Sequence, residues 1–194
     1  MYVTAECRRR NSAHITFEKV SRKRCDGSGE VRRVALSDRR LRKSRWVPSA
    51  SEYIFRNTAD DSSAFILSRE EAWRNGKAYD FAVFDRETCA FLGGVGLNQL
   101  NRAHGFANLG YRVRASGMGR GVAGAAARLA ARFAFEDLRL NRVEIIIAME
   151  NERSQRAAQK AGARREGVLR SRLLIAGRLH DAVMYSLVAA DRNI

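Results

Sequence analysis

The sequence has little proline and cysteine and no long apolar run. Its 194 residues include one proline and three cysteines, Cys7, Cys25 and Cys89. These cysteines lack C-x-x-C spacing and cannot all pair, which argues against a zinc site or a disulfide framework and favours a reducing, cytoplasmic location. No segment reaches the roughly 18 consecutive apolar residues of a membrane-spanning helix. We therefore expect neither a metal nor a membrane partner.

Acidic residues are also scarce, because 21 Asp and Glu face 36 Lys and Arg, for a net charge of +15. Residues 1–45 hold 14 of the basic and 5 of the acidic residues, so this segment alone contributes +9. We expect an atypical basic extension over 1–30, whose order the sequence leaves open, followed by a single domain over 31–190. Basic charge favours polyanions in general, including ribosomes and phosphorylated cofactors. Because most of the excess basic charge lies in residues 1–45, we do not expect the rest of the chain to bind nucleic acid directly.

Apolar periodicity divides the chain into helices and strands. Helical spacing predicts helices over 30–45, 60–76, 122–138 and 154–161. Alternation and turn signals predict strands over 80–84, 91–97, 106–113, 141–149, 166–175 and 178–188, with a weaker option at 14–20. Early helices are thus followed by an antiparallel meander, a glycine loop, a long helix and further strands. This order predicts one domain of the mixed α/β (α+β) class, with helices packed on a sheet.

A glycine-rich loop joins the strand 106–113 to the long helix. Gly117, Gly119 and Gly121 occupy alternate positions in it, which leaves the backbone uncrowded. The N–H groups of the loop, with the positive end of the helix dipole behind them, can converge on an anion. The pattern predicts a phosphate-binding site.

Two common phosphate motifs do not fit this loop. Gly119-x-Gly121-x-x-Gly124 matches the dinucleotide fingerprint, and Glu150 roughly supplies the acidic residue after the next strand. A dinucleotide domain needs further βα units, however, and only 44 residues follow Glu150. The strands before the loop form an antiparallel meander, and no Gly-Lys-Ser/Thr follows the glycines, which excludes a P-loop.

A series of short motifs over residues 80–188 points to a family. They are Gly110-Tyr111-Arg112-Val113, Met118-Gly119-Arg120-Gly121-Val122-Ala123, Asn141-Arg142-Val143-Glu144, Asn151-Glu152-Arg153-Ser154, Lys160-Ala161-Gly162-Ala163, Arg165-Glu166-Gly167-Val168-Leu169-Arg170, Gly177-Arg178-Leu179-His180-Asp181 and Tyr185-Ser186-Leu187. In order and spacing, the chain resembles the GCN5-related N-acetyltransferases (GNAT), and within them the RimJ/RimL-like ribosomal-protein acetyltransferases.

This resemblance implies a mostly antiparallel sheet of six to seven strands with flanking helices and a central splay between the fourth and fifth strands. It implies acetyl-coenzyme A as the cofactor, bound where the strands 106–113 and 141–149 separate. The pyrophosphate would bind the backbone N–H groups of Gly119, Arg120, Gly121, Val122 and Ala123. Met118 opens this loop where relatives carry Gln or Arg, a change that leaves the backbone N–H groups intact.

The resemblance also implies roles near the thioester. The backbone of Val113 would hold the pantetheine arm and polarise the thioester carbonyl. Asn151 would bond the pantetheine, although its position also fits a helix N-cap. Ser154 would lie near the sulfur and protonate the departing thiolate.

The general base is not assigned by the sequence. Many relatives carry Glu ahead of Gly-Tyr, where this chain has Asn108, which cannot act as a base. Glu144, Glu166 and Asp181 are substitutes by residue type only, and Glu166 is taken with Ser154 as a catalytic candidate. A protein α-amine has a pKa near 8 and is partly neutral at physiological pH, so it demands only a weak base.

These features predict an acetyl-coenzyme A-dependent N-acetyltransferase that acts by direct attack of an amine in a ternary complex. None of the cysteines lies in the predicted site, which argues against an acyl-cysteine intermediate. The preferred acceptor is a protein N-terminal α-amine of the ribosomal-protein type. The alternatives are a small amine such as an antibiotic or polyamine, a non-catalytic acyl-coenzyme A sensor or ribosome-binding module, and, third, a nucleic-acid binder. A homodimer remains open.

Overall fold

The computed structural model describes residues 2–8, 12–18, 68–85, 88 and 90–191, the first two ranges as strand backbone only. The helix expected over 30–45, the start of the helix expected over 60–76 and the domain boundary expected at residue 30 lie outside these ranges. Residues 68–74 are helical and lead into the sheet.

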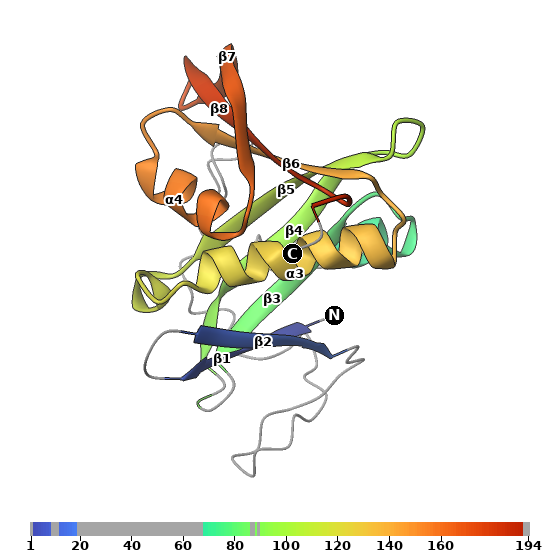
Figure 1. The fold of residues 1–194 in the computed structure, drawn as a ribbon, viewed down its shortest axis with the longest axis vertical. Helices are drawn as coiled ribbons and strands as arrows, with labels where there is room; N and C mark the ends of the chain where they lie inside the picture. The colour runs from blue at the N-terminus through green and yellow to red at the C-terminus, as the bar shows by residue number, and fades with distance from the viewer. Residues whose placement is uncertain (1, 9–11, 19–67, 86–87, 89, 192–194) are drawn as a thin grey trace.

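The described part of the chain contains one sheet of eight strands, in the order β2-β1-β3-β4-β5-β6-β8-β7 (Figure 1). The strands are β1 (Tyr2–Arg8), β2 (Ser12–Glu18), β3 (Tyr79–Asp85), β4 (Phe91–Asn101), β5 (Phe106–Val113), β6 (Arg142–Ala148), β7 (Arg164–Ile175) and β8 (Arg178–Val188). Only the pairs β1–β3 and β5–β6 are parallel. The mixed, mostly antiparallel class is confirmed, but the expected six to seven strands were too few.

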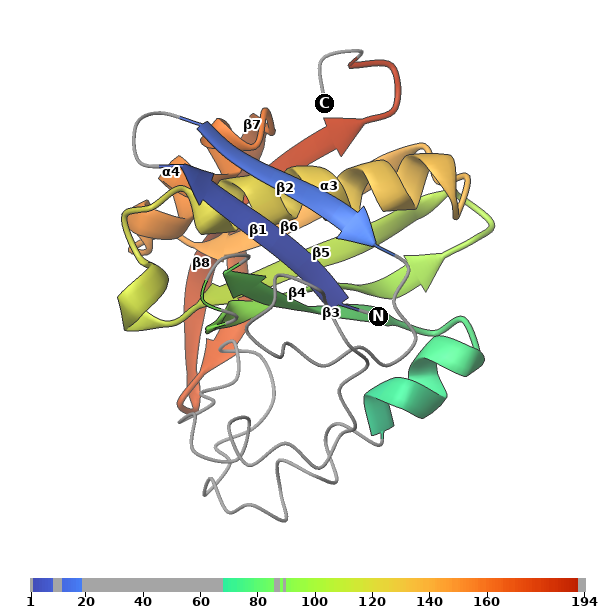
Figure 2. The ribbon, with the colours of Figure 1, turned by 90° about the horizontal axis from the view of Figure 1, so that it is seen from below.

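The difference in strand number arises at the start of the chain. The six strands between residues 79 and 188 all match expected ones, within a few residues at their ends. β1 was not expected, and it pairs parallel with β3 while β2 pairs antiparallel with β1. Figure 2 shows these two strands side by side and the helical segment 68–74 leading into β3.

The helix α3 (Val122–Glu136) crosses one face of the sheet, with α4 (Glu152–Lys160) beside its N-terminal half (Figure 1). Its buried face is rich in alanine, which lets the helix approach the strands closely. At Gly124 a Cβ would lie 3.2 Å from the Ala157 carbonyl oxygen and 3.3 Å from the Lys160 Cβ. Gly124 therefore serves the packing of α3 against α4, not phosphate binding.

The two faces of the central strands differ in side chains. Ala107 and Leu109 of β5 and Ile145 of β6 are buried on the face that α3 covers. The alternate residues, such as Asn108 and Glu144, are half-buried and belong to the opposite face because side chains alternate along a strand.

β5 and β6 separate soon after they begin. The two strands pair only at Phe106↔Arg142, Ala107↔Val143 and Asn108↔Glu144, although β5 continues to Val113 and β6 to Ala148. Beyond this point β5 pairs only with β4, and β6 only with β8. The expected splay is confirmed, and the backbone groups that face each other across it are left for another hydrogen-bonding partner.

Candidate active site

The glycine loop ends at the splay, between the end of β5 and the start of α3. Gly119 and Gly121 have φ angles of +76° and +77°, in the left-handed region that strongly favours glycine. A Cβ on either residue would meet nothing within 4 Å. Glycine is thus required here by the backbone conformation, while the space in front of the loop is open.

The start of α3 leaves its first N–H groups available. Gly121 is the N-cap without a side-chain cap, the first turn holds no acidic residue, and the first bond back to the loop runs from the Ala125 N–H to the Gly121 carbonyl at 3.1 Å. Among the described residues, the N–H groups of Gly119, Gly121, Val122 and Ala123 donate to no backbone carbonyl. Unsatisfied N–H groups at a helix N-terminus, in front of open space, fit a phosphate group.

The side chain of Arg120 anchors the loop to β3. Its Nη2 lies 2.8 Å from Asp85 Oδ2, and Asp85 Oδ1 accepts hydrogen bonds from the Thr88 N–H and hydroxyl. Burial alone would raise the pKa of Asp85, but these hydrogen bonds outweigh it and hold the pKa below its ordinary value. The Arg120 side chain is thus engaged with Asp85, and the role expected for its backbone N–H at a phosphate stays a prediction.

The other side of the splay is formed by the start of α4. Asn151 caps this helix, since its Oδ1 accepts from the Ser154 N–H at 3.1 Å. The Ser154 hydroxyl donates to the Tyr111 oxygen at 3.1 Å, and Tyr111 donates to the Ser154 carbonyl at 2.7 Å. Burial raises the pKa of the Tyr111 phenol, so it remains a donor at neutral pH. Tyr111 thus links β5 to α4 across the splay.

Met118 and Arg153 face each other at the mouth of this site. Met118 is exposed, and the Arg153 Nη1 lies 4.0 Å from its sulfur. A cation from α4 therefore reaches the start of the loop at Met118. Nothing in the residue spacing alone indicates this contact.

Glu166 does not lie at the splay. It forms a two-pronged ion pair with Arg142, at the start of β6 where β5 and β6 still pair, and accepts from the Ser186 hydroxyl at 2.6 Å. The bonds from Arg142 and Ser186 lower its pKa to about 2. A carboxylate so acidic and so placed is a poor proton acceptor. Its selection as a catalytic residue therefore stays a prediction, and these contacts argue against it.

Other polar side chains considered near the site have structural partners. Asp181 accepts from the Ser171 N–H at 2.7 Å, where β7 is irregular, and Asn108, which cannot act as a base, donates to Asn98 Oδ1 at 2.9 Å. His180 Nδ1 lies 3.5 Å from Glu150. These contacts give each side chain a role within the sheet or its hairpin.

A groove of about 680 Å³ lies beside the last β5–β6 pair. Its described lining consists of Gln99, Leu100, Asn101, Arg102, Ala103, Phe106, Asn108, Glu144, Ile146 and Arg172. Asn108 and Glu144 belong to the face opposite α3, and the two strands separate immediately after them. The groove and the glycine loop therefore approach the same slot from opposite faces of the sheet.

The fold, the splay and the open loop define the class of this protein. Residues 30–164 match the family described as Acetyltransferase (GNAT) domain. The chain belongs to this family and is an N-acetyltransferase.

Individual relatives narrow the resemblance. The chain is 37% identical to the "Putative ribosomal N-acetyltransferase YdaF" of Bacillus subtilis. The 178 aligned residues cover 92% of this chain and 93% of the relative. A structure of a "putative ribosomal-protein-serine acetyltransferase" from Vibrio cholerae aligns with a TM-score of 0.62 and 32% identity, over 68% of this chain and 75% of that one. The microcin C7 self-immunity acetyltransferase MccE, in complex with acetyl-CoA and AMP, aligns with a TM-score of 0.62 and 26% identity, over 68% and 72% of the two chains.

None of the helices in the described residues is long and apolar enough to cross a membrane. The described residues also contain no group of three or more His, Cys, Asp or Glu side chains able to hold a metal.

Proposed function

We propose that this protein transfers the acetyl group of acetyl-coenzyme A to the α-amine of a protein N-terminus, of the ribosomal-protein type. The observation that carries the proposal is the splay between β5 and β6, which ends at an open loop. In this loop the N–H groups of Gly119, Gly121, Val122 and Ala123 donate to no backbone carbonyl of the described residues. Family membership supplies the cofactor class, and the names of YdaF and of the Vibrio cholerae relative supply the acceptor class.

In this proposal the cofactor enters from the side of α3. The N–H groups of the loop from Gly119 to Ala123 bind the pyrophosphate, and the backbone groups of β5 that face the slot, beginning with Val113, bind the pantetheine arm. Asn151 uses its Oδ1 to cap α4, which leaves its amide nitrogen to donate to the pantetheine. MccE, which also belongs to this fold, was solved with acetyl-CoA bound.

The bound cofactor supplies an activated thioester. The neutral amine forms a C–N bond to the acetyl carbon, the C–S bond breaks, and the nitrogen loses a proton while the sulfur gains one. An N–H group of β5 that faces the slot polarises the carbonyl. Ser154, released from its hydrogen bond to Tyr111, passes a proton to the sulfur. No acyl-enzyme is involved.

Calorimetry with acetyl-coenzyme A tests the proposal. Gly121→Glu puts a carboxylate into the open space in front of the loop, and we expect it to weaken binding at least 100-fold. Gly177→Glu is a matched control, because Gly177 has a φ of +78° and equally open surroundings but lies in the β7–β8 turn. Equal binding by wild type and both variants would refute the proposed cofactor site.

Turnover then separates an enzyme acting on protein N-termini from the alternatives. We expect acetylation of peptides that begin with Ala or Ser and none of their N-acetylated forms. Acetylation of a polyamine instead would redirect the acceptor, and cofactor binding without turnover of any amine would favour a sensor. A cytoplasmic location and a homodimer stay predictions.

A further inference from the structure

Glu144 occupies a particular place relative to the slot between β5 and β6. It faces Asn108 in the last residue pair before the strands separate, and both side chains line the groove on the face opposite α3. A molecule in this groove therefore reaches the slot from the side opposite the proposed cofactor site. An acceptor bound there could approach the thioester without displacing the cofactor.

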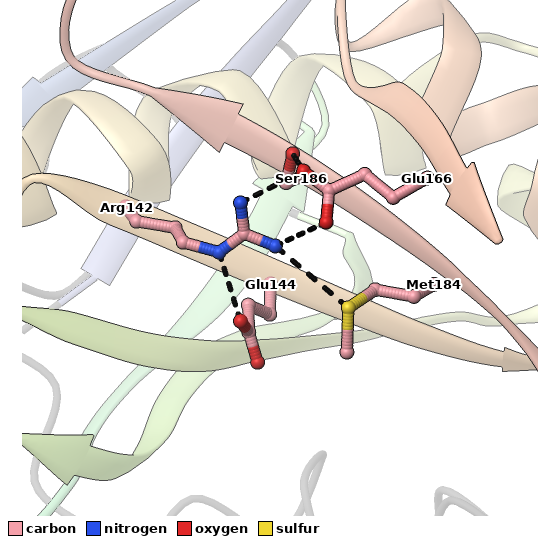
Figure 3. Close-up of polar contacts among 5 residues, drawn as sticks. All are labelled: Arg142, Glu144, Glu166, Met184 and Ser186. Atoms are coloured by element: carbon pink, nitrogen blue, oxygen red, sulfur yellow. Dashed lines mark hydrogen bonds and ion pairs between the residues drawn. The ribbon is translucent and has the colours of Figure 1, made fainter. Parts of the chain in front are cut away.

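A chain of polar contacts holds the Glu144 carboxylate (Figure 3). Arg142 Nε lies 2.8 Å from Glu144 Oε1, and the outer nitrogens of the same guanidinium grip both oxygens of Glu166. Ser186 in turn donates to Glu166. Ser186, Glu166 and Arg142 thus fix the orientation of Glu144 from behind.

The second oxygen of Glu144 is available. Among the described residues, its Oε2 has no hydrogen bond or ion pair, and Figure 3 shows it directed away from Arg142. Arg102 and Arg172 are the other charged side chains in the described lining of the groove, and both are cationic. Glu144 is therefore the single carboxylate that the described lining offers to an amine.

We propose that Glu144 binds the acceptor amine and takes its proton, and that Arg142 and Glu166 are positioning residues. This inference rests on the proposed function. The incoming ammonium hydrogen-bonds to Glu144 Oε2, transfers a proton to that oxygen, and becomes the neutral amine that forms the C–N bond. The proton leaves Glu144 for water. The carboxylate performs the task for which Asn108 lacks the chemistry.

Binding to a dead-end complex tests this role without turnover. The enzyme is loaded with coenzyme A, which carries no acetyl group, and titrated with a peptide amide that begins with Ala, and separately with its N-acetylated form. We expect wild type to prefer the free amine. Glu144→Gln should weaken binding of the free-amine peptide at least tenfold and leave the N-acetylated peptide unchanged.

Kinetics and two further variants sharpen the test. We expect Glu144→Gln to lower kcat/KM for the peptide about 100-fold, the scale of acid–base catalysis, with both a higher KM and a lower kcat. Glu144→Asp keeps the carboxylate and should recover part of the loss in both kcat and KM. It replaces Glu144→Gln in the test if the Gln variant fails to fold. Glu166→Gln should lower kcat/KM by a smaller factor, because Glu166 acts on Glu144 only through Arg142.

Three outcomes would overturn the inference. They are equal affinities of wild type and Glu144→Gln for the free-amine peptide, equal kcat/KM values, and a wild type that binds coenzyme A without preferring the free amine. These differ from failure of the proposed function, in which wild type would not bind coenzyme A. Unchanged coenzyme A affinity in Glu144→Gln shows that a loss belongs to the acceptor side.

Discussion

The two sides of the slot between β5 and β6 differ in the groups that they present, which are backbone N–H groups on one side and side chains on the other. On the α3 side, the loop from Gly119 to Ala123 presents backbone N–H groups held by glycine conformations and a helix N-terminus. On the groove side, Arg142, Glu144 and Glu166 present side chains held by one another. A backbone site tolerates changes of side chain as long as the conformation survives, whereas a side-chain network depends on every member. This contrast suits a constant cofactor on one side and a variable acceptor on the other.

The largest expected effect comes from removing the centre of the side-chain network. Arg142→Met leaves Glu144 and Glu166 as neighbouring carboxylates without their shared cation. We expect a loss of about 2 kcal/mol in the free energy of unfolding, less than for a fully buried pair because Arg142 is 27% exposed. Urea denaturation measures this, and calorimetry should give an unchanged acetyl-coenzyme A affinity. A weakened cofactor site would mean that the two sides are coupled.

Glu166 gives the network a pH signature. Its pKa falls from 4.5 in the unfolded chain to about 2 in the folded one, mainly through Arg142. Its contribution to stability is therefore present above pH 4.5 and is lost as the pH falls toward 2. The stability difference between wild type and Glu166→Gln should shrink over this window. Glu152→Gln, which breaks only the exposed pair with Arg156, is the control and should show a small difference throughout.

The backbone side should respond differently to a small substitution. Gly119→Ala imposes a positive φ on alanine but meets no neighbour, so we expect a loss of about 1 kcal/mol in stability. Acetyl-coenzyme A affinity should fall less than tenfold, because the N–H group remains. Gly177→Ala should lose as much stability with no change in affinity. A hundredfold loss of affinity for Gly119→Ala would show that the loop is not a pure backbone site.

The smallest expected effect is a gain. Met118→Arg places a second cation beside Arg153 at the mouth of the loop, and we expect acetyl-coenzyme A to bind two- to threefold more tightly, about 0.5 kcal/mol. Repulsion from Arg153, whose guanidinium lies 4.0 Å from the present sulfur, limits the gain. The gain should vanish in high salt, since charge screening removes it. Met118→Leu should match wild type, and any gain with leucine would argue against an electrostatic cause.

The sequence predicted those features that depend on neighbours along the chain. The strands Phe106–Val113 and Arg178–Val188 have the expected bounds, and α3 ends two residues before the expected position. Strand alternation, helical spacing and glycine conformation depend on residues close together in the chain, so the sequence alone can predict them. β1 was not predicted, and its parallel pairing with β3, which begins more than 60 residues later, is a contact that the local pattern does not show.

Site residues that depend on distant partners could not be placed in this way. Glu166 was chosen for its acidic type, and its ion pair with Arg142, 24 residues earlier, could not be predicted from the sequence. Gly124 completes a phosphate fingerprint in sequence and is a helix contact in space. Tyr111 and Ser154, 43 residues apart, meet only because β5 and β6 diverge.

Because only three residue pairs join β5 to β6, the amide hydrogens of the sheet should differ in how fast they exchange with solvent. Amide hydrogens of residues 109–113 and 145–148 that point into the slot have no opposite strand to donate to. A deuterium-exchange map should therefore trace the slot as a line of rapidly labelled amides inside a slowly labelled sheet. Adding coenzyme A should first slow the exchange of the slot-facing amides on β5. Deuterium labelling would then show where the cofactor binds without any chemical turnover.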